Sequence, residues 1–381
     1  MNNHVTSPSR RQVLATMVGA GAAAAIGPLD TPARAQPSQP PSISAIAPQL
    51  QGVRDALLAK ARALVDLKLL TRDDGSIYTV DAAQLMIVFA QMNEADGYRA
   101  MREHAEKNLI IDDPNESFTR GFVAWKWKNG QKPDASGTTE ALRLARGLWL
   151  GAKAFNRPAD GELARKILAG YARHATSDQG IWFIRNYYNF ATHSFASNSY
   201  LVDYDPDFLH EVAAETNDAA LAKLADDSYA VVKMAVAPSG LLYDIIQPEV
   251  ATLYPELNVA AFSPNDIVQF SNCCTTATTV TTGHPEIARK ILAIAMNRLD
   301  DLRTYYLGRT AEPFNAKSAA VTEFSVLSRL AANLGAEDAA ATIADRAMND
   351  WKWCVKNLDT RQVFTLTEIL QAMNALLGMG K

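Results

Sequence analysis

Two tryptophans and two acids lie close together in residues 121–155. Trp125 and Trp127 offer flat apolar faces with a polar edge, which suits stacking on a sugar ring. Asp134 and Glu140 offer carboxylates, the groups that hydrolyse glycosidic bonds when two of them flank a bound sugar. The spacing therefore predicts one wall of a sugar-binding cleft.

Glu140 also has an ordinary structural explanation. Thr138 or Thr139 can cap a helix that begins near Glu140, which would make Glu140 a first-turn acid. Such an acid stabilises a helix by about half a kcal/mol, because it faces the positive end of the helix dipole. Glu140 is thus both a candidate catalytic group and a candidate helix-start carboxylate.

Asp266 follows a Pro-Asn turn and precedes an apolar run, so it can cap a helix or act in catalysis. Glycoside hydrolysis needs one protonated carboxyl group that donates to the leaving oxygen. It also needs one ionised carboxylate that activates water or attacks directly. Asp81, Asp134 and Glu140 are the possible partners of Asp266. We therefore take Asp266, Glu140 and Asp81 as the catalytic candidates.

A second aromatic-rich stretch runs from 180 to 207 and shows no clean helical period. Connections of this length are usually functional or disordered, and the aromatic content argues against disorder. We expect this stretch to form another wall of the cleft, although any single aromatic side chain can instead fill space between helices. The side chains that suit stacking or hydrogen bonding to a sugar are Trp182, Tyr187, Tyr200, Asn186, Asn198 and His193.

Apolar residues recur at helical spacing along most of the chain, and strand signals are weak. The connections alternate between short and long, which is typical of helix pairs stacked in sequence. Two all-α arrangements fit, an open solenoid and a closed ring of hairpins. The long aromatic connections favour the ring, because loops gathered at one end of a rigid scaffold build binding sites. The predicted helices span 53–70, 82–92, 97–109, 140–155, 161–176, 207–216, 219–237, 267–282, 285–307, 318–334, 338–357 and 365–377.

The first 35 residues have the pattern of a twin-arginine (Tat) export signal. Arg10 and Arg11 precede an apolar run at 15–26, and Ala33-Arg34-Ala35 is a small-x-small cleavage site. The apolar run is too short and too rich in Gly and Ala to span a membrane. We expect the Tat machinery to export the folded protein to the periplasm or the medium, with residues 36–50 as a flexible lead-in and 51–381 as a single domain.

Composition narrows the class of protein further. The hydrophobic share is 48%, the charged share is 20% and the formal net charge is −4, as in ordinary globular proteins. A chain with this charge offers no basic surface for nucleic acid. Cys273 and Cys274 are adjacent, so at most one of them can pair with Cys354. The cysteine spacing suggests no zinc site, and we expect neither a metal nor another cofactor.

Several of these segments together resemble family 8 of the glycoside hydrolases, exported bacterial endoglucanase-like and chitosanase-like enzymes. The resemblance covers most of the mature chain. It rests on Asn198-Ser199-Tyr200, on the GLLYD turn that ends at Asp244, and on the segment DIVQF that starts at Asp266. The resemblance implies an (α/α)6 barrel, and it implies that Asp266 is the catalytic base.

The chain departs from the family at three functional positions. The family's general acid is a Glu in a Ser-Glu-Gly-x-x-Tyr-Gly-Met pattern, whereas the matching stretch here is TVDAAQLM. Val80 occupies the position of that acid, and a shift of one residue brings Asp81 there. The family's Ala-Thr-Asp-x-Asp motif corresponds to residues 135–140 here, where its acid is lost or, with a shift, replaced by Glu140. Gln269 stands where the family has an arginine after the base.

Three functions agree with these residues. The first is hydrolysis of a polysaccharide such as a β-glucan by Asp266 with Glu140 or Asp81. The second is binding or assembly of carbohydrate without catalysis. The third is a polysaccharide lyase that uses Asn186, Tyr187, Tyr188 and His193. The sugar, the linkage and the oligomeric state are left open. The expected substrate-binding residues are Trp125, Asp134, Trp182, Asn198, Tyr200 and Gln269.

Overall fold

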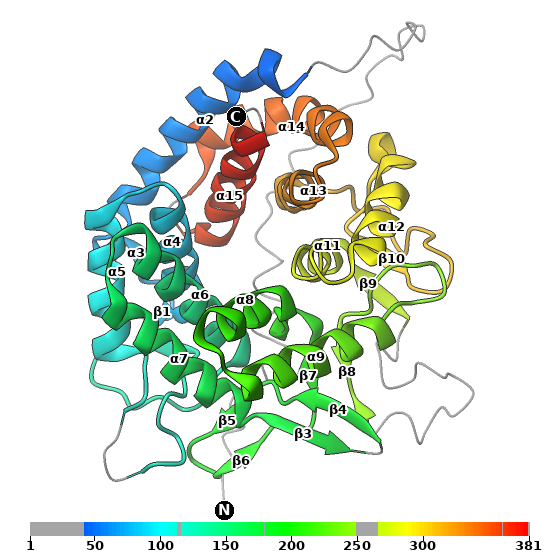
Figure 1. Ribbon diagram of the computed structural model, residues 1–381. Helices are drawn as coiled ribbons and strands as arrows, with labels where there is room; N and C mark the ends of the chain where they lie inside the picture. Colours follow the sequence, from blue (N-terminus) through cyan, green and yellow to red (C-terminus); the bar gives the residue numbers. More distant parts are fainter. Residues whose placement is uncertain (1–41, 113–115, 179, 249–265, 360, 380–381) are drawn as a thin grey trace, which may run out of the picture. The chain divides into compact units, whose positions relative to one another are not determined.

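Amphipathic helices follow one another in pairs along the chain, as the apolar spacing predicts (Figure 1). The computed structural model describes residues 42–112, 116–178, 180–248, 266–359 and 361–379. One helix of each pair lines a ring, and the other covers it from outside. The inner elements are α4 (Thr79–Gln91), α6 (Thr138–Ala154), the 3₁₀ helix η1 (Leu201–Asp203) with α8 (Pro206–Thr216), α11 (Phe270–Thr278), α13 (Val321–Asn333) and α15 (Val363–Met379). The outer helices are α2 (Ile43–Ala63), α5 (Ala95–Asn108), α7 (Pro158–Ala172), α9 (Ala219–Met234), α12 (Pro285–Met296) and α14 (Glu337–Asn357).

Contacts between the inner elements close the ring. Helix α4 packs on α6, α6 on η1, η1 on α11, α11 on α13, α13 on α15, and α15 on α4. The outer helices α5, α7, α9, α12, α14 and α2 pack on α4, α6, α8, α11, α13 and α15 respectively. The described residues therefore form the (α/α)6 barrel that the sequence predicts.

Local sequence explains where several helices begin. Pro158, Pro206 and Pro285 each occupy the first turn of a helix, where the missing N–H has no intrahelical acceptor to satisfy. The side chain of Asp218 caps α9 by accepting the backbone N–H groups of Ala220 and Leu221, the second and third helical residues, both at 3.0 Å. The first residues of these helices are therefore determined by the local sequence.

Four buried polar side chains close a hydrogen-bonded ring inside the barrel. Gln84 of α4 donates to Glu368 of α15 at 2.9 Å, and Gln371 of α15 donates to Gln84 at 2.6 Å. Arg329 of α13 donates to Gln371 at 2.7 Å and forms an ion pair with Glu368 at 3.1 Å. These contacts join three inner helices and so fix their relative positions.

Within the described part of the chain, five short two-stranded antiparallel sheets lie in the connections. The strands β1, β7 and β9 directly precede the inner elements α4, η1 and α11, and the pairs join one connection to another. One end of the barrel is therefore tied together where these inner elements begin. The pairs are β1 (Ile77–Tyr78) with β2 (Lys126–Trp127), β3 (Ala175–Asp178) with β4 (Ile181–Ile184), β5 (Tyr188–Asn189) with β6 (Ser194–Phe195), β7 (Ser199–Tyr200) with β8 (Ile245–Ile246), and β9 (Ile267–Gln269) with β10 (Tyr305–Leu307).

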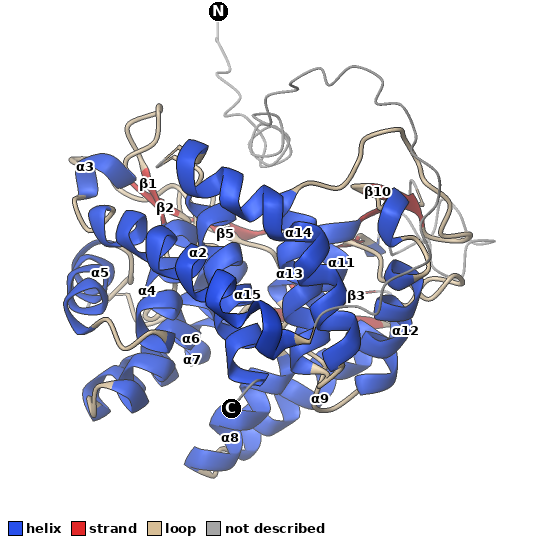
Figure 2. Ribbon diagram, turned by 90° about the horizontal axis from the view of Figure 1, so that it is seen from above, coloured by secondary structure: helices blue, strands red, loops and turns tan. Residues whose placement is uncertain are grey.

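Several expected boundaries differ from the observed ones. Helix α2 begins at Ile43, inside the stretch 36–50 expected as a flexible lead-in, and it buries Ile43, Ile46 and Leu50 against the core. The stretch 180–207 is not irregular, since it contains β4 to β7 and η1. Helix α11 begins at Phe270, after β9. The view from above in Figure 2 shows how small a part of the molecule these strands form. The twin-arginine segment lies outside the described residues.

Close helix packing at Gly151 gives the first testable prediction. A Cβ atom at Gly151 of α6 would lie 2.0 Å from the ring of the buried Tyr98, whereas a Cβ at Gly52 of α2 would meet nothing within 4 Å. We expect Gly151→Ala to lower the free energy of unfolding by about 1–3 kcal/mol through overpacking. The control Gly52→Ala should raise it by up to about 1 kcal/mol, because alanine favours the helix. Urea unfolding followed by circular dichroism measures both, and equal effects would contradict this packing.

Candidate functional site

The connections that lead into the inner helices meet at one end of the barrel, which we call the mouth. Backbone hydrogen bonds join them in turn around the ring. Thr79 N–H donates to the Trp125 carbonyl at 3.1 Å, where α4 begins. Thr138 N–H, at the start of α6, donates to the Asn186 carbonyl at 3.1 Å. Asn186 N–H in turn donates to the Asn198 carbonyl at 2.9 Å. The mouth therefore collects most of the segments that carry predicted site residues.

Asp266 lies at the mouth, just before β9, in a conformation that side-chain-bearing residues seldom adopt. Its φ is 55°, in the left-handed region, and 25% of its side chain is exposed. Its Oδ1 accepts a hydrogen bond from the Tyr243 hydroxyl at 2.8 Å and one from the Arg309 backbone N–H at 3.1 Å. The Arg309 guanidinium lies 3.9 Å from the same oxygen. The carboxylate is thus held in one orientation while it remains open to solvent.

Two neighbours of Asp266 are constrained by this arrangement. Burial and the nearby Asp266 raise the pKa of Tyr243, so the phenol keeps its proton and can donate it in the hydrogen bond. A Cβ atom at Gly308 would lie 2.3 Å from the Tyr243 ring, so glycine is required at that position. Residues of two different connections, one around Tyr243 and one around Gly308, therefore hold Asp266 in place.

Asp244 is a second carboxyl group beside this segment. Its Oδ2 accepts a hydrogen bond from the Gln269 backbone N–H at 2.7 Å. Burial raises the pKa of Asp244 to about 8, although that hydrogen bond acts in the opposite direction. Asp244 is therefore mostly protonated at neutral pH. The sequence shows Asp244 only as the end of a short turn, and a pKa set by burial leaves no signal in a sequence.

Glu140 lies in the first turn of α6, as the helix-start explanation requires, and is 5% exposed. Its carboxylate lies so close to Gly137 that a Cβ there would collide with it at 1.9 Å, and Trp125 contacts the same position. The charge of Glu140 is one of those that act on the buried guanidinium of Arg143. The structure therefore places Glu140 beside Trp125 at the mouth, and its catalytic role stays a prediction.

Asp81 does not have the catalytic position expected for it. It is 0% exposed, and its two carboxylate oxygens accept hydrogen bonds from Arg72 at 2.8 and 2.9 Å. Burial raises the pKa of Asp81, and the nearby Arg72 lowers it. This side chain is occupied by a buried ion pair and is closed to a substrate. Its neighbour Val80 is partly exposed.

Trp125 and Asp134 contact each other as parts of one surface. The Trp125 indole N–H donates to Asp134 at 2.5 Å, and the Trp125 ring packs edge-on against Tyr78 with the centroids 5.5 Å apart. The Lys126 amine lies 4.5 Å from the centre of the Trp125 ring, a cation–π contact. Trp127 instead packs against the largely buried His104. Trp125 is therefore the tryptophan of this pair that remains a candidate for the cleft wall.

The remaining expected substrate-binding residues divide into two groups. Tyr200 and Gln269 are half-buried, in β7 and β9, and Asn198 is half-buried directly before β7. Trp182 lies in β4, which contacts the outer helix α9, so the structure does not bring it to the inner ring. The loop aromatics of 180–207 therefore serve partly as packing, the alternative that the sequence left open.

Two of the four residues expected for a lyase are buried by packing. The Tyr188 hydroxyl contacts His193 Nδ1 at 3.2 Å, as a proton-transfer pair would. However, Tyr188 is 4% exposed and packs against Phe122 and Phe195. Asn186 is 1% exposed. This geometry argues against a lyase site at these residues.

Among the described residues, no group of three or more His, Cys, Asp or Glu side chains is arranged to hold a metal ion. No described helix is long and apolar enough to cross a membrane. Cys273, Cys274 and Cys354 are all buried and free, so the pairing that the sequence allowed for Cys354 is not formed.

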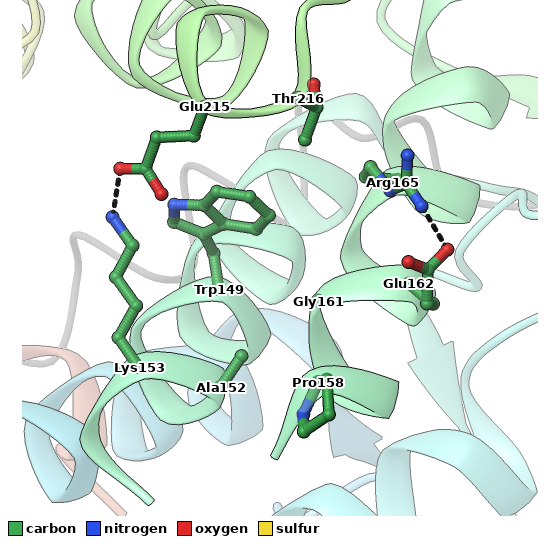
Figure 3. A pocket seen from close by; sticks show the side chains of 9 residues that line it. All are labelled: Trp149, Ala152, Lys153, Pro158, Gly161, Glu162, Arg165, Glu215 and Thr216. Carbon is green, nitrogen blue, oxygen red and sulfur yellow. Dashed lines mark hydrogen bonds and ion pairs between the residues drawn. The ribbon is translucent and has the colours of Figure 1, made fainter. Parts of the chain in front are cut away.

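A groove of about 400 Å³ lies at the other end of α6, away from the mouth (Figure 3). Trp149 is in its centre, with Lys153 bonded to Glu215 on one side and Arg165 bonded to Glu162 on the other. Its charged groups are therefore already paired with one another, and Trp149 is only 7% exposed. Since α6 begins at Thr138, this groove is separate from the mouth.

Comparisons with known proteins bear on the fold. No family model matches the chain, and no curated protein matches it. Solved structures do match. An α-amylase from Clostridium perfringens has a TM-score of 0.63 and 12% identity, covering 79% of this chain and 86% of its own. PssZ from Listeria monocytogenes has a TM-score of 0.58 and 12% identity, covering 78% and 86%.

Rex8A from Paenibacillus barcinonensis, in complex with xylose, has a TM-score of 0.57 and 16% identity, covering 82% of this chain and 85% of its own. Family 8 glycoside hydrolases are among these neighbours, so the resemblance expected from the sequence is confirmed at the level of the fold. At these identities the similarity concerns the barrel, and the site has to be argued from its own residues.

The ion pair of Asp81 gives a prediction for stability. Arg72→Gln leaves the buried Asp81 without its partner and should lower the free energy of unfolding by about 3 kcal/mol. The control Arg361→Gln removes an exposed guanidinium that pairs with Asp73 and Asp359, and it should cost less than about 1 kcal/mol. Chemical denaturation compares the two. A loss at Arg72 no larger than that of the control would mean that Asp81 is not held as described.

The pKa of Asp244 gives a prediction for pH. The folded protein keeps the proton of Asp244 up to a pH of about 8, whereas the unfolded chain releases it near 3.8. Between these values the unfolded state binds fewer protons, so stability from this group falls as pH rises, by at most about 1.4 kcal/mol per pH unit. We expect Asp244→Asn to become more stable relative to wild type between pH 5 and pH 8. A difference that does not change with pH would contradict the buried, protonated state.

Proposed function

We propose that the protein is a glycoside hydrolase that acts on a polysaccharide, with Asp266 as the base that activates water. The observation that carries this proposal is the state of Asp266. It is a strained, partly exposed carboxylate at the mouth, oriented by a phenol and a backbone amide. Strained residues persist only where the surroundings hold them, and they cluster at active sites.

The proton donor of the reaction is Glu140 in this proposal. Of the two acids expected for the role, Asp81 is enclosed by Arg72, and Glu140 lies against Trp125 at the start of α6. An inverting hydrolase uses one carboxylic acid for the leaving oxygen and one carboxylate for water on the opposite face of the sugar. Asp266 and Glu140 come from different connections of the ring, as two groups that flank a substrate must.

The proposed substrate is a β-linked polysaccharide such as a glucan or a xylan. Trp125, which packs on the buried Tyr78, offers an aromatic face at the mouth, with Asp134, Lys126 and Gln269 as polar groups that can contact hydroxyls. Neighbours with the same fold are described as complexes with xylose and with xylobiose. These two observations support a sugar polymer as ligand without selecting its linkage.

We further propose that the Tat machinery exports the protein to the periplasm or the medium. The support is the sequence pattern of residues 1–35, with Arg10 and Arg11 ahead of an apolar run and a small-x-small site. An extracellular location would give the enzyme access to polymers that do not enter cells.

A second candidate, carbohydrate binding without catalysis, is favoured by one observation. Val80 occupies the position where the resembled family has its acid, and the neighbouring Asp81 is buried in an ion pair. A barrel of this kind would hold a sugar chain at the mouth and leave it intact.

Release of reducing ends separates the two candidates. Purified protein should release reducing ends from at least one polymer in a panel of β-glucans, xylans and chitosan. Asp266→Asn should lower kcat by about 10²–10⁴-fold, because a neutral amide cannot accept a proton from water. The control Asp96→Asn changes an exposed acid on the outer helix α5, whose side chain is 94% exposed, and should leave the rate unchanged. If no polymer is cleaved while one of them binds, the second candidate replaces the first.

A further inference from the structure

The turn formed by Tyr243 and Asp244 holds the Asp266 segment at both of its ends. The Tyr243 hydroxyl donates a hydrogen bond to Asp266 Oδ1 at 2.8 Å. Asp244, the next residue, accepts the backbone N–H of Gln269 at 2.7 Å, at the other end of β9. Tyr243 and Asp244 therefore hold the segment 266–269 at its two ends.

Asp244 also connects this segment to η1. Its backbone carbonyl accepts the N–H of Leu201 at 2.9 Å, and β7 pairs with β8 so that Tyr200 lies opposite Ile245. Three connections of the mouth, around residues 200, 244 and 268, thus meet at Asp244. A residue in the left-handed region, such as Asp266, keeps its conformation only under such outside support.

We propose that Asp244 is a positioning residue that orients the Asp266 carboxylate by holding the far end of β9. The proposal rests on the function proposed above and adds a residue to the same site. Asp244 acts through the Gln269 backbone and requires no contact with the substrate. Without this acceptor, the Gln269 N–H loses its hydrogen bond, while β9 keeps its pairing with β10 and Asp266 keeps the hydrogen bond from Tyr243.

The surroundings of Asp244 determine whether its carboxyl group is protonated or ionised while it accepts the Gln269 N–H. The titratable groups that face it are Tyr305 of β10 and Cys273 of α11, and Glu323 of α13 faces Tyr305 in turn. Beyond Tyr243, its own turn leads to Asp266 and Arg309. Burial raises the pKa of Asp244 to about 8, while the hydrogen bond from the Gln269 N–H lowers it. An ionised carboxylate buried in this turn is costly because it has lost its water, so the neutral acid is the state that leaves the turn undisturbed.

Two variants test the proposal in the full protein. Asp244→Asn keeps an acceptor for the Gln269 N–H and cannot ionise, so its kcat should stay within about threefold of wild type below pH 8. Wild-type kcat should fall as pH rises through about 8, and the kcat of this variant should not. Asp244→Ala removes the acceptor and should lower kcat by about 10²-fold with KM nearly unchanged, as expected for a misplaced catalytic group. Asp96→Asn is again the control.

If the kcat of Asp244→Asn falls at alkaline pH in the same way as that of wild type, the proposal is overturned. Asp244→Ala with an unchanged kcat would also overturn it, and if that variant does not fold, the pH profile of Asp244→Asn decides. Hydrogen exchange of the Gln269 amide separates this result from a failure of the proposed function, because it needs no substrate. We expect faster exchange in Asp244→Ala and wild-type exchange in Asp244→Asn. Equal exchange in all three proteins would overturn the positioning role even if no polymer is cleaved.

Discussion

The starts of the inner helices share one physical constraint: the first backbone N–H groups of a helix have no acceptor within it. Four inner elements carry an acid at the third position, namely Asp81, Glu140, Asp203 and Glu323, and the last two of these acids meet this need. Asp203 accepts the N–H of Tyr200 at 3.1 Å, and Glu323 accepts the N–H of Ala320 at 2.8 Å. The mouth is therefore rich in carboxylates for structural reasons, and an acid found there is no sign of catalysis by itself.

Asp266 differs from these acids in each respect that matters. It precedes a strand, its φ is left-handed, and the donors to its side chain are a phenol and an amide from other connections. No helix start requires it. This contrast is the reason to place the base of the reaction at Asp266, and the Tyr243–Asp244 turn is the element that maintains it.

The sequence predicts the helices well because the apolar residues of an amphipathic helix recur at a regular spacing over many positions. It predicts the two-residue strands poorly, since a ladder that short has no period to detect. The ion pair between Arg72 and Asp81 joins residues on two sides of a turn, and the sequence contains no pattern for it. The protonated state of Asp244 depends on burial by three separate connections, so it becomes visible only in the folded chain.

The configuration of the product tests the central claim most directly. A base that activates water on the opposite face of the sugar inverts the anomeric centre. Proton NMR of a β-linked oligosaccharide during cleavage should therefore show the α-anomer first, before mutarotation mixes the two forms. First appearance of the β-anomer would contradict the account, because it would require a covalent intermediate and a nucleophile in place of the base assigned to Asp266.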